Sequence, residues 1–351
     1  MSTSSPSSVV GSYTTQRAEI DSDGALMVGM LCNPIGAIGA TPAFAIIGPI
    51  GFVKEQSPLQ YATRLARLGY TTLVFDPRHF GETGGEPLQY DSPALKTADL
   101  RAAVAFLAQT ATVDPERIGV IGVCMGANWA AAAAAEDPAV SRVALVVGAY
   151  LLRTQMIAGY GDQQGFDDWV ASTAPAHEHF LATGETDYRP MIAERMEDSF
   201  FNFDVPYAWY SNWVRHEPLT YRGRWGNRLA TVSEHELWQH DAEQSFRRIG
   251  VPTLVINSTD SATDLATVEH LVEQLRGESR LVVTGDQIQT QFYDDPLTID
   301  IAVDHIDSWA RSRRVQRNRS TRSLISKQRR ASINANTDAA PTHIRTERCQ
   351  G

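Results

Sequence analysis

The sequence contains few cysteines and no long apolar run. Three cysteines among 351 residues are too few and too widely spaced for a disulfide framework, so we expect a reducing compartment, the cytoplasm. No apolar run reaches the roughly 18 residues that span a bilayer, and no membrane partner is expected. The Ser/Thr-rich start, MSTSSPSSVVGSYTTQ, lacks the basic and then apolar pattern of a secretory signal.

Metal-binding spacings such as CxxC and HExxH are also absent, and we predict neither a metal nor another cofactor.

The charge is unevenly distributed along the chain. Residues 311–351 contain 11 Lys and Arg against Asp338 and Glu347, which leaves −19 for residues 1–310 when the whole chain carries −10. The negative charge of residues 1–310 argues against nucleic acid as the main ligand. The basic segment 313–351 is predicted to be a disordered extension, with contact to nucleic acid or to an acidic partner as the alternative.

Most of the chain shows strand-like and helix-like segments in alternation. TQRAEID and ALMVGMLC flank SDG, which predicts an opening hairpin. Short apolar runs such as FAIIGPIG, TTLVFD and RIGVIGV alternate with helical patterns, and Leu100, Ala103, Val104 and Leu107 form one apolar stripe. This alternation predicts an α/β fold, a mostly parallel sheet with helices on both faces.

The alternation stops between residues 152 and 245, which hold 15 of the 30 aromatic residues. We predict an inserted helical lid over an apolar pocket; a helical subdomain with an aromatic core of its own is the alternative, and both can hold. The predicted substrate contacts are Trp169, Trp209, Tyr210 and Trp213. The predicted organisation is a disordered start (1–15), a core in two parts (16–151 and 246–312), the lid (152–245) and the basic tail (313–351).

Residues 122–126, GVCMG, fit the pattern glycine–x–nucleophile–x–glycine between an apolar strand and a helix. Side chains in place of the glycines would collide with neighbouring backbone at such a sharp turn. The following helix N-terminus favours negative charge, so it would lower the pKa of a thiol and stabilise an oxyanion. We therefore predict that Cys124 is a partly exposed nucleophile; the alternative is a core cysteine in a glycine-rich turn.

Four segments together resemble the α/β-hydrolase superfamily, in its dienelactone-hydrolase-like branch near bacterial hydrolases and fungal polyketide acyltransferases. They are GPIGFVKEQ, FDPRHFGETGGEP, DPERIGVIGVCMGA and QFYDDP, and the resemblance covers residues 16–312. It implies an oxyanion hole formed by the backbone N–H groups of Ile50 and Met125. It also implies a triad acid after the strand TLVINS, at Asp260 or else Asp264.

The histidine of such a triad has no counterpart in the expected loop. Relatives place it after the last strand, where this chain reads GDQIQTQFYDDP. Gln287, Gln289 and Gln291 cannot act as general bases. The remaining candidates are His79, His305 and the histidines of the lid. Without a base, a thiol can still attack an activated ester or thioester, but attack by water on the acyl-enzyme is weakened.

These features predict an acyl hydrolase or acyltransferase that uses Cys124. The expected partner is a small-molecule ester or thioester with a hydrophobic acyl group, such as one of polyketide origin, and a homodimer is considered. The alternatives are a cyclase or isomerase that does not hydrolyse its substrate, and a ligand-binding protein without catalysis. The fold cannot distinguish them, because this scaffold serves many functions.

Overall fold

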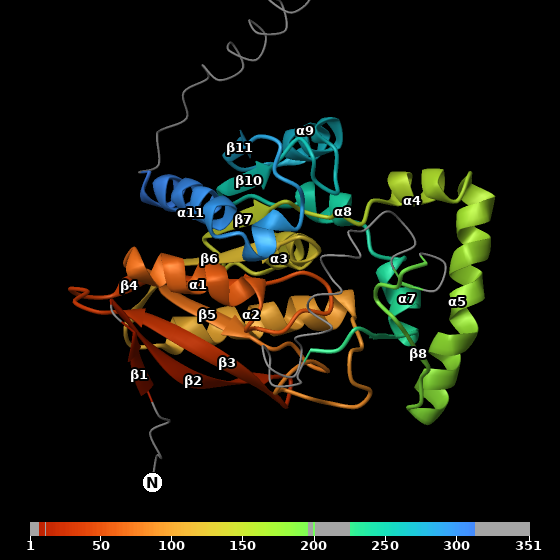
Figure 1. Ribbon diagram of the computed structural model, residues 1–351, viewed down its shortest axis with the longest axis horizontal. Helices are drawn as coiled ribbons and strands as arrows, with labels where there is room; N and C mark the ends of the chain where they lie inside the picture. Colours follow the sequence, from red (N-terminus) through yellow and green to blue (C-terminus); the bar gives the residue numbers. More distant parts are fainter. Residues whose placement is uncertain (1–6, 11, 196–198, 201–224, 313–351) are drawn as a thin grey trace, which may run out of the picture. The chain divides into compact units, whose positions relative to one another are not determined.

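The computed structural model describes residues 7–10, 12–195, 199–200 and 225–312 (Figure 1). The chain divides into two units after Trp309, and the second, Ala310–Gly351, is described only at residues 310–312. The predicted extension 313–351 lies outside the described residues, as do residues 1–6 and 11 of the predicted disordered start. Residues 7–10 and 13–15 of that start lie in strands, so the prediction of disorder is wrong for them. The account that follows concerns the first unit.

The core of the first unit is a nine-stranded sheet in the order β1-β2-β3-β5-β4-β6-β7-β10-β11. The hairpin at its start is confirmed, because Asp23 and Gly24 both adopt positive φ and connect β2 to β3 in a two-residue turn. The antiparallel edge comprises β1 (Ser7–Val10), β2 (Tyr13–Ser22) and β3 (Ala25–Pro34). The strands that follow are parallel to one another: β5 (Thr71–Phe75), β4 (Thr41–Ile47), β6 (Val113–Val123), β7 (Arg142–Val146), β10 (Thr253–Asn257) and β11 (Ser279–Val283).

Helices cover both faces of this sheet, as predicted. They are α1 (Ser57–Arg67), α2 (Pro93–Gln109), α3 (Gly126–Glu136), α9 (Leu265–Gln274), α10 (Gln291–Asp294) and α11 (Pro296–Arg311). The predicted apolar stripe of α2 is buried, since Leu100, Ala103, Val104 and Leu107 are each 0% exposed. Most of the alanines of α3 are also fully buried, which explains why this helix has no polar face.

The direction of the chain reverses at β4. The connection β4–α1–β5 runs one way along the sheet, and β6–α3–β7 runs the other way. Because crossovers between parallel strands are right-handed, this reversal places α1 and α3 on opposite faces. Helix α11 contacts α1 through an ion pair, in which Arg64 Nε of α1 lies 2.5 Å from Asp300 Oδ1 of α11. Ligands of such sheets bind beyond the carboxyl ends of the strands at the reversal, here between β4 and β6.

The described part of the chain between β7 and β10 is mainly helical, consistent with the expected insertion. It contains α4 (Arg153–Gly159), α5 (Gln163–Thr183), β8 (Tyr188–Arg189), β9 (Leu229–Ala230), α7 (Val232–Leu237) and α8 (Ala242–Phe246). Helix α7 lies between α5 and the core (Figure 1). Tyr90, Ala230 and Val232 form a small apolar cluster there, with Phe180 of α5 packed against it.

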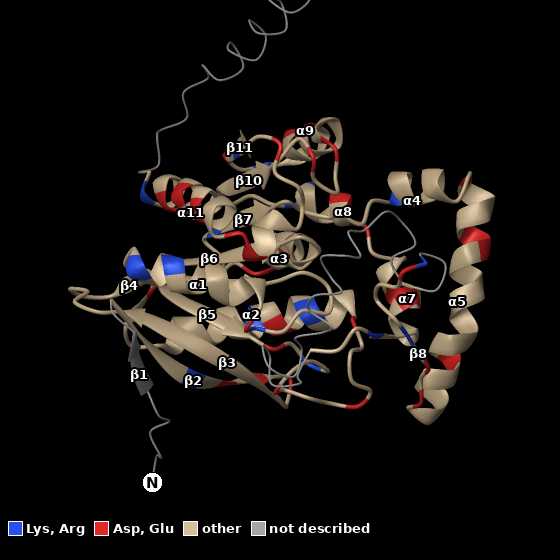
Figure 2. Cartoon of the chain, in the orientation of Figure 1, with Lys and Arg blue, Asp and Glu red and all other residues tan. Residues whose placement is uncertain are grey.

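Acidic side chains predominate on several helices of this unit (Figure 2). Helices α5 and α9 carry acidic residues and no Lys or Arg, and α11 has three aspartates against Arg311. Within the described ranges, no helix has the length and apolar character needed to cross a bilayer.

Candidate active site

Cys124 lies on a strained turn between β6 and α3. Its φ of 57° is in the left-handed region, which residues other than glycine seldom adopt. The turn is held at both sides: the N–H of Cys124 donates to Val146 O of the neighbouring strand (3.0 Å), and its carbonyl accepts from the N–H of Ala127 (3.0 Å). A left-handed residue that the surrounding backbone fixes in this way is typical of a functional position.

The two glycines of the motif are required by close backbone approach. A Cβ on Gly122 would lie 2.3 Å from the carbonyl oxygen of Gly126. A Cβ on Gly126 would lie 2.5 Å from Gly48 O and 2.7 Å from Ile47 O, at the end of β4. The elbow therefore packs directly against the end of the adjacent strand, and the predicted reason for the glycines is confirmed.

The helix that follows the elbow is anchored by Asn128, which is fully buried. Its Nδ2 donates to Met125 O and to Ala149 O, both at 2.9 Å. Its Oδ1 accepts from the N–H of Leu151, also at 2.9 Å. One amide thus connects the first turn of α3 to the segment after β7.

Ile50 lies in the turn after β4, 1% exposed, in the loop that the resemblance assigned to the oxyanion hole. The next residue, Gly51, has a φ of 71° and donates its N–H to Asp91 Oδ2 (3.3 Å). Among the described residues, no backbone carbonyl accepts a hydrogen bond from the N–H of Ile50 or of Met125. Their assignment as oxyanion donors stays a prediction that this arrangement allows.

A buried charge cluster supports the same loop. The ammonium of Lys54 lies 2.6 Å from Asp76 Oδ2, 2.7 Å from Glu82 Oε2 and 2.9 Å from Glu55 Oε1. Asp76 also accepts from the backbone N–H groups of Lys54 and Glu82, both at 2.8 Å. These contacts give Asp76 and Glu82 a structural role.

The environment of the Cys124 thiol differs from the expectation of a partly exposed thiol with a lowered pKa. The residue is only 7% exposed, and burial raises the pKa of its thiol above the ordinary value. Hydrogen bonds from the Tyr293 side chain, the Met125 N–H and the Gln289 side chain lower this pKa but do not offset burial. The expectation of a lowered pKa was wrong because it counted the helix N-terminus and not the loss of solvent.

Gln289 is the residue of the last loop that reaches the thiol. Its Nε2 donates to Val147 O (2.7 Å) and to Tyr293 Oη (3.0 Å), and its Oε1 accepts from the N–H of Ala262 (3.0 Å). Tyr293 is 1% exposed, and its ring packs against Phe52 of the Ile50 loop, with 5.6 Å between centroids. Sequence reasoning missed Tyr293 as a site residue, although it lies within the QFYDDP segment.

The two acid candidates occupy different positions. Asp264 is the N-cap of α9 and accepts from the N–H of Thr267 at 2.9 Å, which is a structural role. Asp260 is exposed after β10 and pairs through its backbone with Ile288, next to Gln289. Its loop therefore adjoins the residue beside the thiol, and Asp260 as a triad acid stays a prediction.

None of the hydrogen-bond partners of the thiol is a histidine in the described part of the chain. The ring of His79 lies 5.1 Å from that of Tyr90, and burial lowers its pKa. His305 is half-buried on α11. His177 and His235 stack on each other between α5 and α7, and burial lowers the pKa of His240 to about 4.

Of the four predicted substrate contacts, the described ranges contain Trp169. Trp169 is half-buried and stacks on Tyr160, with 5.2 Å between centroids, so it contributes to packing inside the α4–α5 segment. Trp209, Tyr210 and Trp213 lie outside the described residues. The predicted apolar pocket therefore stays a prediction.

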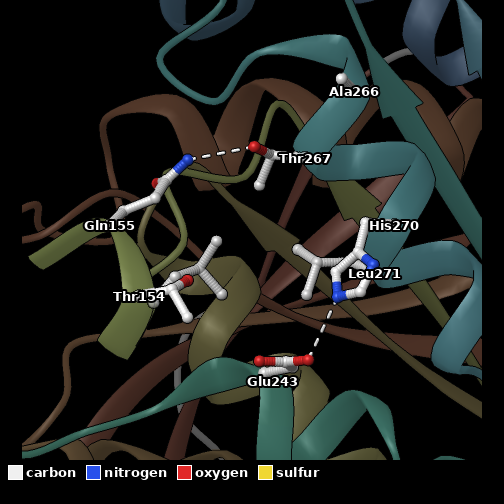
Figure 3. A pocket seen from close by; sticks show the side chains of 8 residues that line it. Thr154, Gln155, Glu243, Ala266, Thr267, His270 and Leu271 are labelled. Atoms are coloured by element: carbon white, nitrogen blue, oxygen red, sulfur yellow. Dashed lines mark hydrogen bonds and ion pairs between the residues drawn. The ribbon is translucent and has the colours of Figure 1, made fainter. Parts of the chain in front are cut away.

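Two cavities of the described residues lie away from the elbow. The first, of about 290 Å³, is lined by α4, α8 and α9, where His270 lies 3.2 Å from Glu243 and Gln155 donates to Thr267 (Figure 3). The second, of about 440 Å³, is lined by residues 86–87, 179 and 184–188. Neither cavity is lined by Cys124.

Comparisons with known proteins agree with this architecture. A family model described as alpha/beta hydrolase fold matches residues 56–294. The crystal structure of the hypothetical protein PA2218 from Pseudomonas aeruginosa has a TM-score of 0.69 and 24% identity, and the match covers 85% of this chain and 94% of that chain. At this identity the likeness shows the fold.

Similarity to curated proteins is confined to segments. PA2218 is 44% identical over 121 residues, which cover 34% of this chain and 32% of that protein. The thiohydrolase apmlB of Arthrinium phaeospermum is 34% identical over 128 residues, covering 36% and 39%. The polyketide transferase claH of Penicillium crustosum is 35% identical over 127 residues, covering 36% and 41%. The chain thus matches between 32% and 41% of the length of these relatives.

Proposed function

Because the chain belongs to the alpha/beta hydrolase fold family, we propose that it is an enzyme of acyl chemistry with Cys124 as its nucleophile. The observation that carries this proposal is the left-handed backbone of Cys124, at the strand-to-helix turn where β4 and β6 end side by side. That turn presents a side chain to the crevice in which ligands of such sheets bind.

The substrate class is proposed from the relatives and the chemistry of the thiol. One relative is named a thiohydrolase and another a polyketide transferase, which supports an ester or thioester of a hydrophobic small molecule. In the reaction, the sulfur of Cys124 attacks the carbonyl carbon, and the backbone N–H groups of Met125 and Ile50 stabilise the developing oxyanion.

A second candidate function is a cyclase or isomerase without a covalent intermediate. Two observations favour it: burial raises the pKa of the thiol, and no partner of the thiol among the described residues is a histidine. In this alternative the pocket shapes a reactive substrate, and Cys124 does not form a bond with it.

Turnover of p-nitrophenyl acyl esters, combined with mass spectrometry of the protein, distinguishes the two. We expect release of p-nitrophenol with an acyl adduct on Cys124. Cys124→Ala should lose turnover and keep its fold, because removal of one sulfur costs little packing. Full activity of Cys124→Ala would contradict covalent chemistry and favour the cyclase or isomerase.

A further inference from the structure

The carboxamide of Gln289 is a neighbour of the Cys124 thiol. Its oxygen is engaged by the N–H of Ala262, and its nitrogen donates to Val147 O and Tyr293 Oη. Both N–H groups of the amide are thereby taken, and an amide has no basic lone pair. At this position the site offers no general base.

Tyr293 contributes a hydrogen-bond donor beside the sulfur. Its Oη accepts from Gln289 Nε2, so the hydroxyl proton is directed away from Gln289, and the hydroxyl makes a hydrogen bond with the thiol that lowers its pKa. The packing of its ring on Phe52 connects this hydroxyl to the Ile50 loop. Together with the Met125 N–H, this hydroxyl gives the sulfur two hydrogen-bond donors, an arrangement that stabilises a thiolate once it forms.

We propose, resting on the proposed function, that the Tyr293 hydroxyl, oriented by Gln289, is a hydrogen-bond donor that makes Cys124 exchange acyl groups between thiols instead of hydrolysing thioesters. Tyr293 contacts the reacting sulfur, and Gln289 is a positioning residue that orients the Tyr293 hydroxyl. The substrate class is a thioester, and the acceptor is a second thiol.

The exchange balances without any group that the site lacks. The Cys124 thiol gives up its proton to solvent, and its sulfur forms a bond to the thioester carbon while the carbonyl π electron pair moves to oxygen. When the carbonyl reforms, the original C–S bond breaks, and the leaving thiolate takes up one proton. The products are acyl-Cys124 and a free thiol. A second thiol reverses the same steps and carries the acyl group away.

Water is a poor acyl acceptor at such a site. The pKa of a free thiol is about 8.5, whereas that of water is about 15.7, so water needs a base to remove its proton during attack. A glutamine amide cannot serve as that base. A positioned base contributes about 10²–10⁴-fold to such a step, and hydrolysis should be slower than thiol exchange by a factor in this range.

The loop beside Gln289 allows a direct test by substitution. Asp260 pairs through its backbone with Ile288, and Ala262 contacts the Gln289 side chain, so an acidic loop adjoins position 289. Gln289→His would place an imidazole between this loop and the sulfur. Gln291→His is the matched control, because Gln291 Oε1 instead accepts from the N–H of Ile288 (2.9 Å).

The experiment incubates the full chain with an acyl-N-acetylcysteamine thioester and deuterated N-acetylcysteamine. Label exchange, release of free acid and the mass of the protein are followed together. The native chain should exchange label and form acyl-Cys124, with acid release slower by about 100-fold or more. Gln289→His should raise acid release by about 100-fold, and Gln291→His should not.

Tyr293→Phe keeps the ring and removes the donor. We expect slower exchange and a shift of the pH profile of Cys124 alkylation to higher pH, with a modest drop in melting temperature because Gln289 Nε2 loses its acceptor. The proposal is overturned if acyl-Cys124 hydrolyses as fast as it exchanges, if Gln289→His matches Gln291→His, or if Tyr293→Phe moves neither rate nor profile. The proposed function itself fails only if no adduct forms on Cys124 and Cys124→Ala remains active.

Discussion

Replacement of Lys54 by methionine tests how the buried charge cluster supports the loop that contains Ile50. The Lys54 side chain is 3% exposed, and its ammonium lies within 3 Å of carboxylate oxygens from Asp76, Glu82 and Glu55. Methionine keeps an unbranched apolar stem of similar length and removes the charge. The substitution therefore leaves Asp76, which is fully buried, without its cation.

The expected loss in free energy of unfolding follows from that burial. Breaking a buried ion pair by removing one partner costs about 3–5 kcal/mol. The two backbone N–H groups that Asp76 retains should keep the loss within this range. Arg248→Met is the matched control: Arg248 and Glu136 lie 2.8 Å apart with side chains 50% and 39% exposed. Such an exposed pair contributes about 0–1 kcal/mol.

The stability cost of Lys54→Met should depend on pH, and the direction follows from the pKa of Asp76. Burial raises the pKa of Asp76, and the Lys54 ammonium opposes this effect. A carboxyl with a raised folded-state pKa contributes stability below its unfolded pKa and loses it as the pH rises through its folded pKa. Lys54→Met raises the folded-state pKa of Asp76 further. The loss in free energy of unfolding should therefore be largest at about pH 8 and smaller at about pH 5.

Urea unfolding followed by tryptophan fluorescence measures these differences, since the chain has seven tryptophans. The double variant Lys54→Met/Asp76→Asn should recover part of the loss, because it removes the unpaired charge. A cost for Lys54→Met no larger than that of Arg248→Met, and independent of pH, would refute the reasoning.

Four further changes probe the elbow and its thiol. In a Cys349→Ser background, the rate of Cys124 alkylation by iodoacetamide should keep rising with pH beyond the range of an ordinary thiol, because burial raises its pKa; Cys32, whose pKa burial raises to about 11, should react more slowly, and a plateau near neutral pH would contradict this. Cys124→Ser should lose about 100-fold or more in acyl turnover, since serine depends on a base, and substantial ester turnover would show that a base is present. Gly126→Ala should cost about 1–3 kcal/mol in urea unfolding and most of the activity, as its Cβ would lie 2.5 Å from Gly48 O; a neutral result would show that the elbow can relax. Asn128→Leu leaves three backbone groups without their partner and should cost at least about 2 kcal/mol, whereas a melting temperature equal to that of the native chain would argue against this anchor.

The sequence predicted the features of the fold that depend on local patterns. Positive φ at Asp23 and Gly24 follows from the SDG turn, and the buried stripe of α2 follows from helical periodicity. The elbow glycines were also predictable, because a strand-to-helix turn around a nucleophile leaves no room for side chains. Because the turn requires these residue types, the family resemblance could be stated from motifs alone.

The surroundings of the thiol could not be predicted in this way. Gln289 contacts Val147 and Ala262, which are distant in sequence, and no local pattern indicates which of three glutamines reaches the sulfur. The pKa of Cys124 depends on burial by the assembled fold, which outweighs the helix N-terminus that the sequence displays. Tyr293 belongs to a recognisable motif, but its contact with Cys124 arises only from tertiary packing.

The mass of the intact protein after incubation with an acyl-N-acetylcysteamine thioester tests the central claim most directly. The account predicts one acyl group per chain, mapped by peptide mass spectrometry to Cys124, absent in Cys124→Ala, stable in water and removed by added thiol. An unmodified Cys124 in a chain that nevertheless turns over the thioester, with Cys124→Ala equally active, would contradict it.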